Sequence, residues 1–457
     1  MRSTQTLTSY KKKYSFPILD LLNIEVEVTD NPFSLPVDEL FTMAARINNK
    51  RSFLFMSKLI GKHIPIHPNK ALLTSALLAV RYYETKMNAE FDGKTIFLAE
   101  FLKTNPDFKR DAFIPMAVCP MIIGFAETAT ALGHAFSDCF TNASYVHTTR
   151  EELEDQEPVI VFEEEHSHAT SHRCYFPLDM IQNDRDIVLV DDELTTGKTA
   201  LNIIRSIHSR FPRKYYTVAA ILDWRTAESK RAFTKLELEL GINIHVISLV
   251  AGTVHIDSVK EVPDEDEDSQ VGSKTAVKIE RIAVSQFFPQ KRNSPVAKKG
   301  KMGTACFIEE TGRFGLKTDQ VLEITEKVNR AAAYLAEKRS GKRTLCLGTG
   351  EFMYLPLAIA AKLGNGIFYQ STTRSPIFVH NEKGYGARYK AAFPNPENDE
   401  ITNYVYNIPE GFYDEMFVFF EREVPDSELE PFLEQLKNTG VQTIKLVFFS
   451  QNEVGAI

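Results

Sequence analysis

The clearest structural signal in this chain is the stretch Ile187-Val-Leu-Val-Asp191-Asp192-Glu-Leu-Thr195-Thr196-Gly197-Lys198-Thr199. Its first four residues are all apolar, which is typical of a strand buried on both faces of a sheet. Two acids end that strand, and a Thr/Gly loop follows. Apolar residues at helical spacing from Ala200 to Ser209 then predict a helix. The stretch therefore predicts a strand–loop–helix unit of an α/β fold.

The loop of this unit has the chemistry of a phosphate site. Backbone N–H groups at a helix start point outward and carry partial positive charge, so they bind anions. Thr195, Thr196 and Thr199 add hydroxyl donors, and Gly197 lets the backbone approach an anion closely. The two carboxylates suit the hydroxyls of a ribose or a hydrated Mg²⁺. Together these groups predict a site for a ribose 5-phosphate.

Two other interpretations compete for this stretch. Gly197-Lys198-Thr199 suggests an ATPase P-loop, but that motif needs a glycine five residues before Gly197, where this chain has Asp192. A capped helix after a buried strand would need no ligand. Two adjacent acids at a strand end would then cost desolvation free energy without compensation. We therefore favour the phosphate site.

Alternating strands and helices surround this unit. Residues 218–222 and 242–250 predict further buried strands, which is the pattern of a doubly wound parallel sheet. The same alternation returns toward the C-terminus. The elements predicted there are a helix over 319–338, a strand over 344–347, a helix over 355–363, a strand over 416–420, a helix over 428–437 and a strand over 444–449. We expect an α/β protein with two doubly wound parallel-sheet domains.

Composition and length narrow the class of protein. A chain of 457 residues is too long for one ordinary domain and predicts two or three. The net charge of −8 gives no basic footprint for nucleic acid, and no apolar run is long enough to span a membrane. Five cysteines lie far apart without a Cys-x-x-Cys pair. This spacing favours a reducing cytoplasm over a disulfide framework or a zinc ribbon.

The clearest break along the chain lies over residues 262–301. An acidic run from Asp264 to Asp268 precedes a basic stretch that contains proline and glycine. Like charges repel and offer no apolar surface to bury, so we expect a solvated linker, with a partner-binding tail as the alternative. The predicted domains are residues 1–261 and 302–457.

Residues 187–199 resemble the PRPP-binding motif of type I phosphoribosyltransferases, which has an apolar strand, two acids and a Thr-Thr-Gly loop. The resemblance implies that Asp191 and Asp192 hold the ribose hydroxyls of PRPP and orient Mg²⁺. It implies that the 5-phosphate is held by Thr195, Thr196, Gly197, Lys198 and Thr199. Lys198 differs from the small residue common there. The implied reaction loosens the C1–pyrophosphate bond while a nitrogen nucleophile attacks C1.

Two flanking segments fit the layout of that family. Residues 121–128 are a strand that runs into a turn, where the family has its pyrophosphate loop, but the usual Arg or Lys is missing. The candidate contacts in this loop are Gly124, Phe125, Ala126 and Glu127. Trp224 follows the strand after which purine-type members contact the base. We leave two interpretations open for it, stacking on a base and half-buried packing.

Two further segments carry titratable or basic residues. In the family a mobile loop closes over the site, here within residues 159–177, and His166, His168 and His172 lie in it. Because histidine titrates near neutrality, we expect an acid–base role. A solvated hairpin and a metal site that adds Cys174 are the alternatives. The basic segment 45–65 is open between an anion site and a plain basic surface.

The two halves of the chain share an internal echo. The pattern Tyr-x-x-Thr-Thr-Arg at 145–150 recurs at 369–374. The same offset between the copies maps Gly124 onto Gly348 and Glu127 onto Glu351. Further on, at the end of the predicted strand 416–420, Val190-Asp191-Asp192 would match Phe420-Glu421-Arg422, which acids and a proline follow. We therefore interpret the C-terminal half as a degenerate copy that lost its phosphate loop.

The segment Thr373-Arg374-Ser375-Pro376 resembles the TRSP domain, found after phosphoribosyltransferase domains in bacterial tellurium-resistance (Ter) stress operons. The resemblance implies a role in making a nucleoside-like metabolite. The expected ligand contacts in this half are Gly348, Glu351 and Arg374. A tight strand–helix turn would equally explain the Gly-x-Gly at 348–350.

These observations predict a two-domain enzyme that transfers a phosphoribosyl group from PRPP to a base-like acceptor, or runs the reverse phosphorolysis. The expected catalytic residues are Asp191, Asp192, Glu127, Arg150, His166 and His168. We expect Mg²⁺, PRPP and a nucleobase-like molecule as partners, no nucleic acid and no membrane, and leave a homodimer open. The alternative is a regulator that binds PRPP or a nucleotide without catalysis, which the missing loop cation favours. A metal-binding stress protein is a third interpretation.

Overall fold

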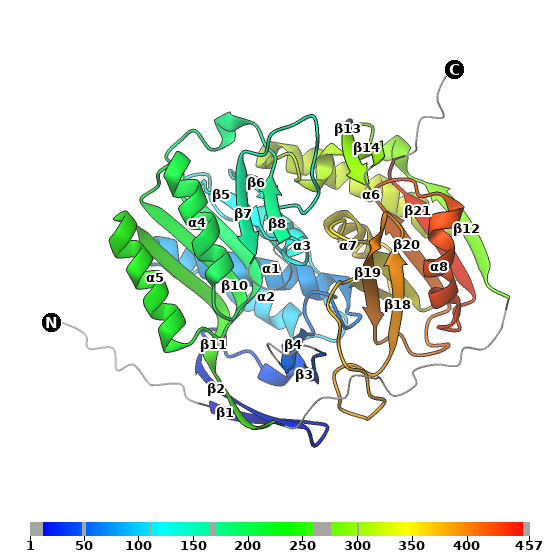
Figure 1. The fold of residues 1–457 in the computed structure, drawn as a ribbon, viewed down its shortest axis with the longest axis horizontal. Coiled ribbons are helices and arrows are strands. Elements are labelled where there is room, and N and C mark those ends of the chain that lie inside the picture. Colours follow the sequence, from blue (N-terminus) through cyan, green and yellow to red (C-terminus); the bar gives the residue numbers. More distant parts are fainter. Residues whose placement is uncertain are drawn as a thin grey trace.

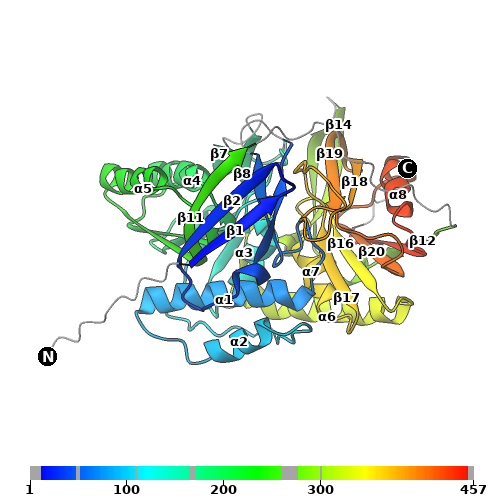
Figure 2. The same cartoon turned by 90° about the horizontal axis from the view of Figure 1, so that it is seen from below.

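The structure, a computed structural model, describes residues 12–47, 52–109, 111–164, 170–259, 276–298 and 301–450. Within these residues the chain forms two large sheets that lie side by side, each with helices on both faces (Figures 1 and 2), and four two-stranded hairpins. The predicted class, α/β with parallel-sheet domains, is confirmed.

The first sheet has eight strands, and its five middle strands are parallel. In spatial order they are β1 (Lys12–Ile18), β2 (Leu22–Asp30), β11 (Asn243–Val259), β10 (Tyr215–Asp223), β9 (Ile187–Leu194), β5 (Met121–Gly124), β6 (Ser144–His147) and β15 (Leu316–Lys317). β9 and β10 lie centrally and are buried over most of their length, as their uninterrupted apolar residues predict.

Helices on both faces cover this sheet (Figure 2). α1 (Pro68–Met87) and α3 (Ala129–Ser137) pack on one face, and α4 (Lys198–Arg210) and α5 (Ala227–Leu240) lie on the other. The buried side of α4 consists of aliphatic residues at helical spacing. Because α4 follows β9 directly, its N-terminus lies at the carboxyl ends of the strands.

The second sheet has five strands, all parallel. In spatial order they are β12 (Lys278–Ala283), β21 (Thr443–Phe448), β20 (Glu415–Phe420), β16 (Thr344–Gly348) and β17 (Ile367–Ser371). Its helices are α6 (Val321–Lys338), α7 (Tyr354–Ala360) and α8 (Asp426–Lys437). The predicted helices and strands of both halves, from the strand at 187 to the strand at 444, are confirmed. Most ends shift by a few residues, but the strand predicted over 242–250 continues to Val259 as β11.

The two sheets share one order of parallel strands. β10-β9-β5-β6 in the first corresponds to β21-β20-β16-β17 in the second. The helices correspond as well, since α3 follows β5 as α7 follows β16, and α4 joins β9 to β10 as α8 joins β20 to β21. The strand beside β10 follows it in the chain, whereas the strand beside β21, β12, precedes the whole unit. Duplication of one unit, with one strand moved to a different place in the chain, would produce this shared strand order.

A hairpin interrupts both units at the same place. β7 (Ile160–Glu164) and β8 (Thr170–Cys174) lie between β6 and β9, and β18 (Lys390–Asn395) and β19 (Asn398–Tyr406) lie between β17 and β20. Thr149 and Arg173 exchange two backbone hydrogen bonds of 2.8 Å, and Thr373 and Tyr404 exchange two of 2.7 and 2.9 Å. Thr149 and Thr373 occupy the same position of the repeated pattern, so the echo extends to the backbone pairing.

The sheet register corrects one detail of the echo. Gly124 pairs with Val190, and Gly348 pairs with Phe419. Asp192 therefore corresponds to Glu421, one residue away from the match made at the strand ends. By this register the second unit keeps one acid where the first has two.

The stretch 262–301 differs in part from the expected linker. Its acidic run lies outside the described residues. β12 lies within the stretch, and β13 (Lys291–Lys298) pairs with β14 (Lys301–Ile308) as a hairpin. Phe288, between β12 and β13, is fully buried. This part of the chain therefore packs against both units instead of being solvated, since β12 pairs with β21 and Val296 of the hairpin packs with Leu153 and Tyr175 of the first unit.

Contacts between the two units are reciprocal. α3 packs against its counterpart α7 at the centre of the molecule (Figure 1). Leu316 in β15, from the second half, pairs with Tyr145 at the edge of the first sheet. Ile66, from the first half, pairs with Tyr369 at the edge of the second. Each unit thus covers an edge strand of the other.

The remaining elements are short. They are the hairpin of β3 (Phe41–Ala45) and β4 (Phe53–Ser57), α2 (Lys94–Phe101), and the 3-10 turns Val37–Glu39, Leu178–Met180, Ser285–Phe287, Glu309–Thr311 and Thr318–Gln320. In the described ranges, no helix combines the length and the apolar character that crossing a membrane requires.

Candidate active site

A cavity of about 310 Å³ opens at the carboxyl ends of β5 and β9, beneath the β3–β4 hairpin and beside the second unit. Both units contribute to its wall. The lining residues are Arg46, Leu54, Phe55, Lys62, His63, Phe125, Ala126, Glu127, Thr128, Arg150, His172, Asp191, Asp192, Glu193, Thr199, Thr373, Arg374 and Ser375.

Asp191 and Asp192 lie in this wall, near the carboxyl end of β9. The apolar residues before them are fully buried, whereas the two acids are partly exposed. The Asp192 backbone N–H donates to Asp191 Oδ1 at 2.8 Å, which fixes the first carboxylate. Burial, and then the charge of Asp192, raise the pKa of Asp191 well above its usual value. A cation or a hydroxyl donor bound here would relieve this repulsion.

The basic segment 45–65 contributes the cations Arg46 and Lys62, and a histidine, to the same cavity. Arg46, Lys62 and His63 line the wall, and Lys62 Nζ lies 3.5 Å from Asp192 Oδ2. Of the two interpretations of this segment, a basic lining of a cavity therefore agrees with the structure better than a plain basic surface.

The loop between β9 and α4 faces two cavities. Thr199 lines the cavity of the two acids, whereas Thr195, Thr196 and Lys198 line a neighbouring cavity of about 500 Å³. Gly197 has a φ of 72°, and a Cβ there would lie 2.6 Å from the Phe233 ring, so only glycine fits. The first turn of α4 carries no acidic residue. Its N–H groups therefore suit an anion.

The loop after β5 brings an acid, and no cation of its own, to the cavity. A Cβ on Gly124 would lie 2.6 Å from the Ala129 carbonyl oxygen, so this turn also requires glycine. The Ala126 N–H donates to Thr148 Oγ1 at 2.8 Å. Glu127 lines the cavity and is only 8% exposed.

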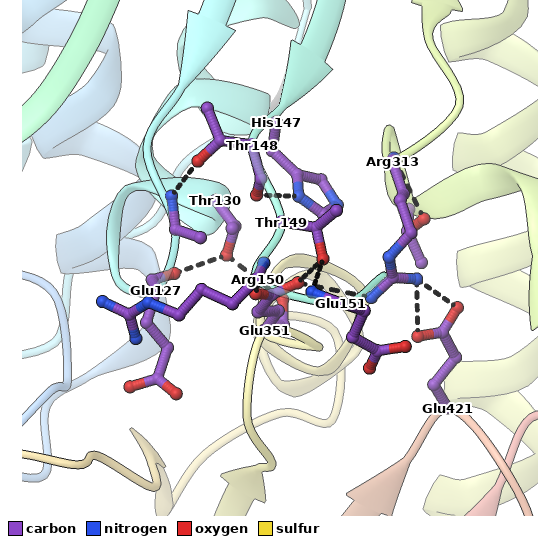
Figure 3. Close-up of polar contacts among 12 residues, drawn as sticks. Glu127, Thr130, His147, Thr148, Thr149, Arg150, Glu151, Arg313, Glu351 and Glu421 are labelled. Atoms are coloured by element: carbon purple, nitrogen blue, oxygen red, sulfur yellow. Dashed lines mark hydrogen bonds and ion pairs between the residues drawn. The ribbon is translucent and has the colours of Figure 1, made fainter. Parts of the chain in front are cut away.

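Arg150 lines the cavity from the chain just after β6, and its backbone is tied to the second unit. Its N–H donates to Glu351 Oε1 at 2.8 Å, and Thr149 Oγ1 donates to Glu351 Oε2 at 2.5 Å (Figure 3). Burial alone would raise the pKa of Glu351, but the charges of Arg313 and His147 outweigh it and leave that pKa below its usual value. Glu351 therefore acts as an ionised contact between the units.

Of the other ligand contacts predicted in the second half, Gly348 lies in a tight turn and Arg374 lies in this cavity. Gly348 ends β16, where a Cβ would lie 2.9 Å from the Phe352 carbonyl oxygen. Arg374 lines the cavity of the first unit, together with Thr373 and Ser375. The structure thus brings Arg374 to the acids of β9, a placement that the sequence did not predict.

In the second unit, ion pairs surround the acid at the corresponding strand end, Glu421 after β20. Arg313 Nη1 donates to both oxygens of Glu421 at 3.0 and 2.9 Å, and both side chains are almost fully buried (Figure 3). Arg422 makes a two-bond pair with Glu151 of the first unit at 2.8 and 2.9 Å. Protein cations therefore occupy the surroundings of Glu421.

The histidine segment is described only in part. His166 and His168 lie outside the described residues, so their predicted role stays a prediction. His172 lines the cavity, and its Nδ1 lies 3.0 Å from Thr148 Oγ1. Within the described ranges, no group of three or more His, Cys, Asp or Glu side chains is arranged to hold a metal.

Trp224 packs behind the wall of the first cavity. It is 4% exposed. Its ring stacks on the Phe55 ring with the centroids 5.0 Å apart, and it packs edge-to-face with the Phe41 ring at a centroid distance of 5.8 Å. It lines the neighbouring cavity, whereas Phe55 lines the cavity of the acids. The packing interpretation of Trp224 therefore fits better than base stacking, and Trp224 positions Phe55.

Sequence reasoning missed several residues of the site. Leu54 and Phe55 carried no signal beyond belonging to an apolar run, and Thr373 and Ser375 required knowledge of the domain contact. Arg313, which pairs with Glu421 and does not line the cavity, was missed as well: it lies in a Thr-Gly-Arg-Phe-Gly segment that is typical of an exposed loop, yet it is 2% exposed.

Comparisons with known proteins agree with this architecture. Residues 40–253 match a phosphoribosyl transferase family, and residues 310–436 match the TRSP domain found C-terminal to it. No curated protein matches the chain.

Among solved structures, similar chains are adenine phosphoribosyltransferases. The enzyme of Trypanosoma brucei is 11% identical, with a TM-score of 0.31 over 50% of this chain and 82% of that chain. The enzyme of Saccharomyces cerevisiae is 13% identical, with a TM-score of 0.26 over 47% of this chain and 96% of that one. The enzyme of Leishmania tarentolae is 15% identical, with a TM-score of 0.25 over 48% and 88%. Likenesses this low carry no argument about the substrate.

Proposed function

Since this chain belongs to the phosphoribosyltransferases that carry a C-terminal TRSP domain, we propose that it transfers the phosphoribosyl group of PRPP to a nucleobase-like acceptor with the help of Mg²⁺. One observation carries the proposal. Asp191, Asp192 and Thr199, from the end of a buried strand and the start of a helix, line the same cavity. Two carboxylates beside a helix-start anion site suit a ribose and its 5-phosphate.

The 5-phosphate would bind at the loop from Thr195 to Thr199. The N–H groups at the start of α4 and the threonine hydroxyls would donate hydrogen bonds to its oxygens. Gly197 supports this role, because its left-handed backbone and the nearby Phe233 ring leave no room for a side chain.

The two acids also fit a magnesium ion that arrives with its substrate. Mg²⁺ commonly takes one or two protein carboxylates and completes its shell with substrate phosphates and water. Asp191 and Asp192 offer two carboxylates, and the described residues contain no denser cluster of ligating side chains. When bound, Mg²⁺ would supply the charge that balances the phosphates and the acids.

The transfer exchanges one bond at C1 of the ribose for another. The C1–O bond to pyrophosphate breaks and its oxygen keeps the electron pair, while a nitrogen of the acceptor forms the new C1–N bond. Asp191 and Asp192 would hold the ribose hydroxyls as positive charge develops at C1. We propose His166, His168 or Glu127 as the base that takes the proton the acceptor loses.

An apolar part of the wall supports a planar acceptor. Leu54, Phe55 and Phe125 line the cavity beside the charged groups. Aromatic side chains of this kind stack on nucleobases. The acceptor class is therefore nucleobase-like.

We place the reaction in the cytoplasm and in a bacterial stress response that makes a nucleoside-like metabolite. The match to the TRSP domain supports the second part. The first part is supported by the five cysteines, all of which are free thiols.

The test replaces both acids in the full chain, D191N with D192N. We expect PRPP–Mg²⁺ affinity, measured by calorimetry, to fall by more than about 100-fold, because each lost charged contact costs roughly 1.5–3 kcal/mol. The matched control is E326Q with E337Q, two exposed acids of α6, which removes the same charge at a distance. Unchanged affinity in the first variant would contradict the assignment. Transfer is tested by measuring the release of pyrophosphate from PRPP by the wild-type protein with a panel of bases. Binding of PRPP without pyrophosphate release in the presence of any of these bases would support the non-catalytic regulator.

A further inference from the structure

The cavity has cations on its wall although the loop after β5 has none. That loop, residues 124–128, contributes the acid Glu127 and no Arg or Lys. Its Ala126 N–H is already bonded to Thr148. A ligand with several negative charges leaving from C1 therefore needs cations from elsewhere.

Arg374 of the second unit lies across from that loop. Its Nε is 3.4 Å from Glu127 Oε1, and its side chain is 30% exposed, within a cavity that also holds Asp191 and Asp192. The guanidinium thus meets the loop from the opposite side of the domain boundary. Arginine presents several donors in a fixed plane, which suits phosphate oxygens.

The backbone that carries Arg374 is fixed. Thr373 exchanges two backbone hydrogen bonds with Tyr404, and the Ser375 N–H donates to Thr373 Oγ1 at 3.3 Å. Arg374 is thereby positioned by β19 of its own unit. The fixed backbone directs this side chain to the cavity and lowers the entropy that the segment loses when an anion binds.

The domain boundary itself is built from the repeated residues. Arg150 and Arg374 end the two copies of the Tyr-x-x-Thr-Thr-Arg pattern and line the same cavity. Glu127 lies against Arg374, and its counterpart Glu351 accepts from the backbone of Arg150. Figure 3 shows the Arg150 side chain extending from Glu351 toward Glu127. Both arginines of the echo therefore serve one site.

His63 adds a buried donor to this group. It is 3% exposed and lines the cavity, and neither ring nitrogen has a hydrogen-bond partner in the described part of the chain. Burial, together with Lys62 and Arg46, holds the pKa of His63 well below its usual value. A neutral imidazole carries one N–H, and an anion in the cavity would satisfy it.

We infer that the pyrophosphate subsite of this enzyme is formed between the two units, with Arg374 of the TRSP domain and Arg150 of the transferase domain binding the leaving group and His63 donating a hydrogen bond to it. This inference rests on the proposed function. When the C1–O bond of PRPP breaks, the pyrophosphate oxygen keeps the electron pair, and the two guanidinium groups balance the added charge without losing a proton. The transferase domain is therefore incomplete without the TRSP domain.

The test uses the full chain with three ligands, pyrophosphate, ribose 5-phosphate and PRPP, each with Mg²⁺, in calorimetry. In R374Q we expect pyrophosphate and PRPP affinity to fall about 10- to 100-fold, as loss of a charged hydrogen bond predicts. Ribose 5-phosphate, which lacks the leaving group, should bind within about twofold of wild type and shows that the variant is folded. R374K should recover part of the loss, and R330Q, an exposed arginine of α6, should change nothing.

The outcomes separate this inference from the proposed function. Wild-type protein that binds neither ribose 5-phosphate nor PRPP contradicts the proposed function. Wild-type protein that binds both, with pyrophosphate affinity unchanged in R374Q, contradicts only the interdomain subsite. An equal loss of ribose 5-phosphate and pyrophosphate affinity also overturns it, because Arg374 would then act on the fold of the cavity. R374Q leaves Glu127 without its ion-pair partner, so the double variant R374Q with E127Q removes the negative charge that could itself repel pyrophosphate. The double variant should still bind pyrophosphate weakly, because the cation that binds it is missing.

Discussion

The two strand ends that correspond by register, Asp192 in the first sheet and Glu421 in the second, have opposite surroundings. Asp192 is partly exposed in a cavity and forms a 3.5 Å contact with Lys62. Glu421 is 3% exposed and accepts two hydrogen bonds from Arg313. One framework therefore supports two solutions for a carboxylate at the end of a buried strand.

The difference lies in what supplies the opposite charge. A carboxylate taken out of water needs a cation or several donors. In the second unit Arg313 provides them, and the strand end becomes part of the contact between the units. In the first unit the repulsion between Asp191 and Asp192 is left for a ligand to relieve. A binding site and a structural contact thus differ by the placement of one arginine.

The largest expected effect comes from removing that arginine. R313M leaves Glu421 buried with its main partner lost, so the free energy of unfolding should fall by about 3–5 kcal/mol. Denaturant unfolding of the full chain measures it, with R330M on the exposed side of α6 as the control. Equal midpoints for the two variants would mean that the ion pair does not hold the second strand end closed.

A smaller effect should separate the loop of the first strand from an ordinary turn. Gly197 and Gly241 both have positive φ, 72° and 67°, so alanine costs about 1 kcal/mol at either. Only at Gly197 would the new Cβ meet the Phe233 ring, and at Gly241 nothing lies within 4 Å. We expect G197A to weaken ribose 5-phosphate binding by about 10-fold or more. G241A, the control, should bind it normally, and equal affinities would argue against a phosphate at this loop.

The smallest effect is a gain in stability. Burial and Asp192 raise the pKa of Asp191 in the folded protein above 3.8, so its ionisation costs stability as the pH rises through the raised pKa. Below about pH 3.8 both states are protonated and the cost vanishes. D191N should therefore raise the Tm of the ligand-free protein at neutral pH by about 1–3 °C and leave it unchanged near pH 4. A lower Tm at neutral pH would show that Asp191 is stabilising.

Local patterns predicted the elements well, because continuous apolar runs and helical spacing are determined by nearby residues. The strand before Asp191 and the loop around Gly197 follow from thirteen adjacent residues. The constant offset between the halves identified the repeated pairs up to Arg150 and Arg374. The later strands were matched by their ends, which carry no information on sheet register. The match of Asp192 to Glu421 therefore required the pairing of Gly124 and Gly348 with their neighbours.

Long-range placement was beyond the sequence. Lys291 and Arg292 begin a strand although their charge predicted a solvated linker, because their hairpin pairs through the backbone and its apolar side chains pack with Leu153 and Tyr175 of the first unit. Arg374 and Arg313 were unpredictable for a related reason. Whether an arginine lies in solvent, in a cavity or in an ion pair depends on the other domain, which local composition does not describe.

Because each unit covers an edge strand of the other, the two halves of this protein cannot readily be separated. β15 of the second half covers Tyr145, and Ile66 of the first half covers Tyr369, at positions that the echo makes equivalent. Either half produced alone would expose the edge of a parallel sheet, and uncovered edges invite intermolecular pairing and aggregation. The two halves therefore depend on each other for solubility, so that in evolution neither could be lost or exchanged without its partner.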